Sequence, residues 1–209
     1  MLPPNEASGS LALAADISEE GDWFVGAQRF AASQGRPAWH TRAVYHQRGD
    51  FWVVTDELIA FGPQAVEFGW RLAPGLSGAW QGGALQVKNS AGEVLLRMLP
   101  LDQKGELAAG LQASMLKGRD EPVVDGWYSN DFNRREATEV WRFRPKFSAP
   151  LVLHWVMLPV GRLPDESAAL VSIRRLLAGY SFPLRTHASW FRPNAAALAN
   201  ASGPGSKID

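Results

Sequence analysis

Histidine is the residue type in this chain best suited to acid–base or metal chemistry, and it occurs four times. His40 and His46 lie six residues apart in one predicted strand, which places their Cα atoms about 20 Å apart, too far to share a metal ion. His154 interrupts an apolar run, where we expect a hydrogen-bonded core histidine rather than a ligand. The sequence has no His-x-His or His-Glu-x-x-His spacing. We therefore predict no metal site and no cofactor.

Two pairs of side chains are candidates for binding a substrate. His40 and Arg42 fall on one face of a predicted strand, where they would present a base and a carboxylate-neutralising cation together. Trp127 and Tyr128 lie in a predicted loop, where they could stack on a sugar ring or pack into the core. We take these four as candidate substrate-binding residues and assign no catalytic residue.

Other residues that could take part in chemistry are better interpreted as having structural roles. Asp56 ends a predicted strand and is expected to cap it or to pair with an arginine. Trp70 and Trp141 stand beside arginines and could form sugar platforms, but their alternation favours a place in the core. No nucleophile elbow, phosphate-binding loop or dinucleotide fingerprint is present.

The first candidate pair lies in a predicted β-hairpin over Trp39–Asp56. Side chains alternate with a period of two through both arms, which are rich in aromatic and β-branched residues. The polar turn Gln47–Asp50, which contains a glycine, joins the arms. Because both faces carry large apolar groups, we expect a central hairpin covered on both sides, with Trp52 and Val54 well buried.

Further short segments that are apolar or alternating follow one another, bounded by turns. They are 11–17, 23–30, 65–72, 82–87, 93–101, 105–116, 137–143 and 151–158. This pattern predicts an all-β, antiparallel β-sandwich of the supersandwich type. Residues 164–178 favour one helix over a strand, because acids open the segment and arginines lie near its end. We expect an exposed lead-in over 1–20, a β-sandwich domain over 21–192 and a flexible tail over 193–209.

Composition excludes several classes of protein. The 21 basic and 21 acidic residues give a net charge of zero with no long run of one sign, which argues against nucleic acid and against a polybasic membrane patch. Cysteine is absent, so disulfides and thiolate chemistry are excluded. No apolar run reaches the roughly 18 residues of a spanning helix, and the N-terminus has no signal-peptide pattern. We expect a soluble chain, with periplasm and cytoplasm both open.

Four motifs occur in a recognisable order. They are His40-x-Arg42, Phe51-Trp-Val-Val-x-Asp56, Phe68-x-Trp-x-Leu-x-Pro-Gly75 and Gly126-Trp-Tyr-Ser129. Their order and spacing resemble the C-terminal β-sandwich region of heparinase II/III-like proteins, over roughly residues 20–160. That family contains polysaccharide lyases that act on uronic-acid-containing chains by β-elimination.

The resemblance implies a partner domain as well as a substrate class. Family members carry an N-terminal helical toroid with catalytic Tyr, His and Asn residues, and a His- and Asp-containing metal-binding stretch opens their sandwich. Both would lie before residue 1, so the toroid would be on a separate or missing chain and the isolated chain would be inactive. Acidic polysaccharide, such as a glycosaminoglycan or alginate, would be its ligand. The alternative is a stand-alone carbohydrate-binding or structural module.

Overall fold

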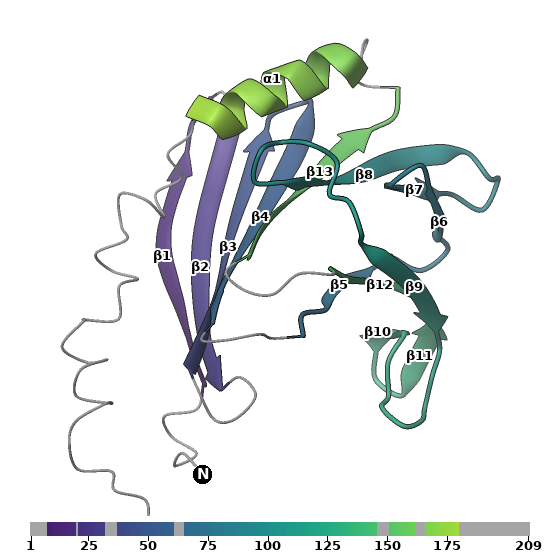
Figure 1. Ribbon diagram of the computed structural model, residues 1–209. Coiled ribbons are helices and arrows are strands. Elements are labelled where there is room, and N and C mark those ends of the chain that lie inside the picture. Colours follow the sequence, from purple (N-terminus) through teal and green to yellow (C-terminus); the bar gives the residue numbers. More distant parts are fainter. Residues whose placement is uncertain are drawn as a thin grey trace, which may run out of the picture. The chain divides into compact units, whose positions relative to one another are not determined.

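Strands dominate the computed structural model, which describes residues 8–19, 21–31, 37–60, 65–145, 151–161 and 166–179 (Figure 1). All its strands belong to one compact unit that ends at Glu166, and the single helix of the described residues belongs to a second unit. The strands are β1 (Ser8–Ile17), β2 (Gly21–Ala31), β3 (Pro37–Gln47), β4 (Phe51–Ala60), β5 (Phe68–Arg71), β6 (Ser77–Gln81), β7 (Ala84–Lys88), β8 (Val94–Asp102), β9 (Gln112–Lys117), β10 (Trp127–Asp131), β11 (Arg134–Ala137), β12 (Glu139–Arg144) and β13 (Leu151–Pro159). The helix is α1 (Glu166–Gly179), so helix rather than strand is confirmed for this segment.

The largest sheet has eight strands in the order β1-β2-β3-β4-β13-β8-β7-β6, and every pairing in it is antiparallel. The predicted hairpin is confirmed as β3 and β4, which pair from Gln47 opposite Phe51 to Ala38 opposite Ala60. Its turn is closed by the Asp50 N–H, which donates to the Gln47 carbonyl oxygen at 3.1 Å. The hairpin lies inside the sheet rather than at its edge, as its two apolar faces predict.

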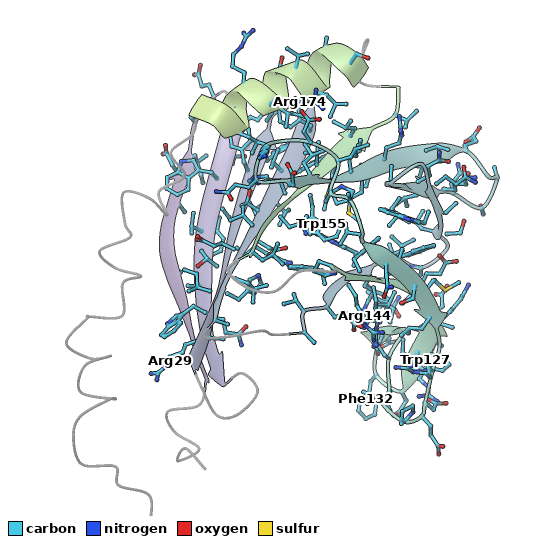
Figure 2. All side chains as sticks on the ribbon, in the orientation of Figure 1. Arg29, Trp127, Phe132, Arg144, Trp155 and Arg174 are labelled. Atoms are coloured by element: carbon cyan, nitrogen blue, oxygen red, sulfur yellow. The ribbon has the colours of Figure 1, made fainter. Side chains whose placement is uncertain are left out.

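A second, three-stranded sheet in the order β5-β12-β9 packs against one face of the large sheet. Trp155 of β13 lies at the centre of this contact and is fully buried. Its ring meets those of Phe68, Trp70 and Phe143 with centroid separations of 5.7, 5.6 and 5.0 Å. Figure 2 shows Trp155 projecting from the large sheet toward the smaller one. The two packed antiparallel layers confirm the predicted all-β sandwich.

The middle of the hairpin's second strand, Val53–Asp56, is buried on both faces. Val54 and Asp56 are buried on the face toward the smaller sheet, and Val53 and Thr55 are buried on the opposite face. Trp52 departs from the prediction, because it is only half-buried. It lies next to the turn and stacks on His46, with ring centroids 4.5 Å apart. Its apolar area is therefore covered by a neighbour on β3 rather than by the second layer.

Three strands, β6, β10 and β11, were not predicted. Residues 126–131 were expected to form a loop, but β10 spans Trp127–Asp131 and pairs with β11, so that prediction is wrong. β6 also lacks a sequence signal of its own. At the N-terminus, β1 starts at Ser8, within the predicted lead-in, and pairs along its length with β2. The predicted tail, 193–209, lies outside the described residues.

His154 is the hydrogen-bonded core histidine that the sequence predicts. It is 5% exposed, and its Nδ1 lies 2.8 Å from the hydroxyl oxygen of Thr55. Burial lowers the pKa of His154 from 6.5 to about 4, against a small opposing effect of Asp102. The imidazole is therefore neutral in the folded protein at neutral pH.

His154 makes stability depend on pH. The unfolded state takes up a proton on this side chain below pH 6.5, whereas the folded state does so only near pH 4, so stability falls as pH drops through this window. At pH 5 the expected loss is about 2 kcal/mol. Urea unfolding at pH 7.5 and pH 5 measures it, and His154→Gln should flatten the difference while His46→Gln should not. Equal pH dependence in wild type and His154→Gln would contradict the assignment.

Candidate functional site

The most connected polar group of the sandwich is the carboxylate of Asp56, which is 0% exposed. Oδ1 lies 2.6 Å from His40 Nε2 and accepts a hydrogen bond from Arg42 Nε at 2.7 Å. Oδ2 accepts from Arg42 Nη2 at 2.9 Å and from Trp155 Nε1 at 3.0 Å. The register explains the convergence, since Arg42 stands directly opposite Asp56 and Trp155 belongs to the next strand, β13. The predicted pairing of Asp56 with an arginine is confirmed.

Asp56 is ionised despite its burial. Burial raises the pKa of this carboxyl, but hydrogen bonds from His40 and Arg42 and the charge of Arg42 outweigh that effect and hold the pKa below its usual range. An ionised carboxylate can only accept hydrogen bonds, so His40 Nε2 carries the proton that it shares with Asp56. Nδ1 of His40 is then the nitrogen that remains for another partner, and this side chain is 27% exposed.

Arg42 is held on two sides. Its Nε and Nη2 bind Asp56, and its guanidinium lies over the ring of Trp70 with the central carbon 5.3 Å from the ring centroid. Its side chain is nevertheless 39% exposed. A planar guanidinium fixed along one edge presents its remaining N–H groups in a fixed direction.

The second candidate pair lies elsewhere. Trp127 and Tyr128 belong to the two-stranded sheet of β10 and β11, not to the large sheet that carries the first pair. Because they are neighbours in a strand, their side chains point to opposite faces. Trp127 is half-buried, donates from Nε1 to the Arg119 carbonyl oxygen at 3.3 Å, and is covered by Arg135 at 4.2 Å from its ring centroid. Tyr128 is exposed. The structure thus brings His40 and Arg42 together and gives Trp127 and Tyr128 no common surface.

A second polar cluster, which the sequence analysis missed, lies on the face of the three-stranded sheet that is turned away from Trp155. Asp125 accepts from Arg71 Nη2 at 2.8 Å and from Arg142 Nη2 at 2.5 Å. Glu67 accepts from Arg144 Nε at 2.8 Å. The hydrogen bond from Arg142 is the largest cause of a lowered pKa at Asp125. The alternation of arginines with tryptophans in β5 and β12 was the available signal. Arg71, Arg142 and Arg144 each have an acidic partner, so we interpret this cluster as stabilising the three-stranded sheet.

The structure offers no metal centre within its described residues: no three His, Asp or Glu side chains there gather around a common point. The one helix in the described part of the chain is neither long nor apolar enough to cross a membrane.

Fold and site together define an antiparallel β-sandwich in which a buried aspartate fixes a histidine and an arginine on a sheet face. The chain belongs to the family described as heparinase II/III-like, C-terminal, whose model matches residues 5–169. This confirms the resemblance that the sequence motifs carry. No curated protein matches the chain.

Solved structures show the same fold. Heparinase III, the BT4657 gene product, superposes with a TM-score of 0.52 at 13% identity, over 72% of this chain and 21% of that one. The heparan sulfate lyase HepC from Pedobacter heparinus gives a TM-score of 0.53 at 14% identity, again over 72% and 21%. The chain therefore spans about a fifth of the length of these structures. At such identities the likeness establishes the fold alone.

Proposed function

We propose that this chain serves as the β-sandwich part of a polysaccharide lyase that acts by β-elimination on uronic-acid-containing chains. The observation that carries the proposal is the family match over residues 5–169. The proposal assigns proton transfer to a helical domain outside these residues and substrate binding to the sandwich.

The chemistry of β-elimination supports this division of roles. The reaction needs a cation to neutralise the uronate carboxylate, a base to remove the C5 proton and an acid to protonate the departing C4 oxygen. Arg42 is a suitable cation. Asp56 suits neither of the other roles, because it is fully buried and its two oxygens accept from His40, Arg42 and Trp155. His40 Nδ1 could accept a proton beside Arg42, but the proposal assigns this face the holding of the acidic sugar and leaves proton transfer to the helical domain.

The isolated chain is expected not to cleave heparan sulfate or alginate. Each elimination creates a conjugated double bond, so ultraviolet absorbance of the products measures activity directly. We expect no rise in absorbance with the chain alone, and a rise when it is produced together with a helical toroid domain of a heparinase II/III-like lyase. Absorbance from the chain alone, abolished by replacing one of its own residues, would contradict the division of roles. No absorbance from either preparation would contradict the lyase assignment.

A second candidate function is a carbohydrate-binding module that acts without a catalytic domain. It is favoured by one observation, the shared exposed face of β2 and β3 that carries Phe24, Gln28, His40 and Arg42. The same absorbance measurement separates the two candidates, because a binding module gives no product in any preparation.

A further inference from the structure

We propose that the exposed face of β2 and β3 around Arg42 binds the carboxylate of a uronic acid residue within a sugar chain. We call it the Arg42 face, and it consists of Phe24, Gly26 and Gln28 on β2 with His40 and Arg42 on β3. The identity of the ligand rests on the proposed function, whereas the site itself rests on the geometry of these five residues.

Register places the members of the Arg42 face side by side. Gly26 stands opposite Arg42, and Gln28 stands opposite His40. Phe24 lies two residues from Gly26, and alternation puts it on the same side of the sheet about 7 Å away. Gly26 has no side chain, so nothing on β2 covers the guanidinium from that direction. Phe24 is 46% exposed and Gln28 is also exposed, so an aromatic ring, an amide and a cation share one open surface.

Arg42 is pre-organised for a carboxylate. A guanidinium has five N–H donors, and two of those of Arg42 bind Asp56. The others, on Nη1 and the outer side of Nη2, have no acceptor among the described residues and form the edge that matches a carboxylate with two parallel hydrogen bonds. Asp56 and Trp70 already fix the plane of the group. A ligand therefore meets a donor pair whose conformational entropy has been removed by folding.

Donors also exceed acceptors beside Arg42. The indole Nε1 of Trp70, the ring over which the guanidinium lies, is buried and has no hydrogen-bond partner among the described residues. Both oxygens of Asp56 are occupied by His40, Arg42 and Trp155. Asp56 therefore leaves no free acceptor for the outer N–H groups of Arg42, which a ligand with oxygen acceptors can satisfy.

Phe24 selects a sugar among oxyanions. An exposed aromatic face stacks on the C–H groups of a pyranose ring, and a ligand without such a ring gains nothing from it. A uronic acid carries the ring and the carboxylate on adjacent atoms, and Gln28 can donate to and accept from its hydroxyls. Free phosphate or sulfate would use Arg42 alone.

The test is the binding of a glucuronate-containing tetrasaccharide to the whole chain, measured by calorimetry and by nuclear magnetic resonance shifts of the backbone amides. We expect saturable binding with the largest shifts at Phe24, Gly26 and Gln28. The same tetrasaccharide with its carboxylates reduced to alcohols should bind at least about tenfold more weakly, because the bidentate contact is lost. Shifts confined to other strands, or equal binding of the two sugars, would overturn the inference.

Variants locate the contact. Arg42→Lys keeps the charge but loses the planar fork, and should weaken binding about tenfold. Phe24→Ala removes the exposed ring and should weaken binding several-fold, because one stacking contact with the sugar ring is lost. The matched control is Arg144→Gln, which removes one exposed positive charge from the three-stranded sheet and should leave the affinity unchanged.

These measurements can refute the Arg42 face without refuting the proposed lyase function, and the reverse. If Arg42→Lys lowers the thermal midpoint so far that the chain does not fold, the exposed Phe24→Ala variant decides. Unchanged affinity in Phe24→Ala and Arg42→Lys, or equal loss in Arg144→Gln, would refute the Arg42 face. Binding that is lost in both face variants, in a protein that never yields an absorbing product, would leave the site standing and remove the lyase.

Discussion

Replacing Trp155 with alanine should lower the free energy of unfolding by about 3–5 kcal/mol, the usual cost of truncating a fully buried tryptophan. The ring is fully buried and contacts Phe68, Trp70 and Phe143 of the other layer. Its indole nitrogen also donates to Asp56, so the variant loses packing and a buried hydrogen bond together. Urea unfolding of wild type and variant, followed by fluorescence and circular dichroism, measures the difference.

Trp52→Ala is the matched control for that measurement. Trp52 is half-buried, and its main aromatic contact is the stacked ring of His46. The expected loss is no more than about 2 kcal/mol, because less apolar area is removed from water at this position. If Trp52→Ala costs as much as Trp155→Ala, the assignment of the core to the Trp155 contact is wrong.

Asp56→Ala should cost about 3–5 kcal/mol, as for removing one partner from a buried ion pair. The substitution leaves the indole N–H of Trp155 buried without an acceptor and removes the anchor of His40 and Arg42. Asp22→Ala is the control, since Asp22 also binds an arginine, Arg48, at 2.8 Å but is exposed to solvent. Little change is expected there, because an exposed pair is screened.

Acid titration gives the Asp56 prediction a second readout. The folded-state pKa lies below the ordinary value of 3.8, so the stabilising effect of the carboxylate is complete above that value and is lost as pH falls through the lower folded pKa. Wild type should therefore lose stability below about pH 4, beyond the loss that His154 causes at higher pH. Asp56→Ala should lack this component. If the free energy of unfolding falls equally below about pH 4 in both proteins, Asp56 is not the group responsible.

The hairpin and its polar contact were predictable because they depend on local alternation. A period of two fixes which side chains share a face, and a charged residue amid apolar neighbours needs a partner of opposite charge. That reasoning led correctly from Asp56 to an arginine and from His154 to a hydrogen-bonded core position.

Alternation alone does not indicate which part of the eight-stranded sheet is covered by the three-stranded sheet. Trp52 and Trp155 both lie in strands rich in apolar residues, yet only Trp155 meets the aromatic rings of β5 and β12. The packing partners of these two strands are set by tertiary structure, which no local pattern encodes.

The missed strands have physical reasons as well. β6 has no β-branched residue and contains Gly78, where an added Cβ would collide with Nε1 of Trp141, so the glycine serves close packing rather than a turn. β10 and β11 are mostly exposed and polar, and their turn depends on Asn133 with a φ of 57°. An exposed hairpin buries little on either side and leaves no hydrophobic period to detect.

The position of β13 has a consequence for the order in which the chain can assemble. It is the last strand of the described residues, yet it lies between β4 and β8 at the middle of the large sheet, and its contacts Thr55–His154 and Asp56–Trp155 each span 99 residues. During synthesis, β1 to β4 and β6 to β8 emerge as separate meanders, and the edges of β4 and β8 that β13 later covers are open. Those edges are aggregation-prone templates until β13 inserts, and closing so long a loop is slow. Cellular yield should therefore depend on how the nascent chain is protected before Leu151–Pro159 leaves the ribosome.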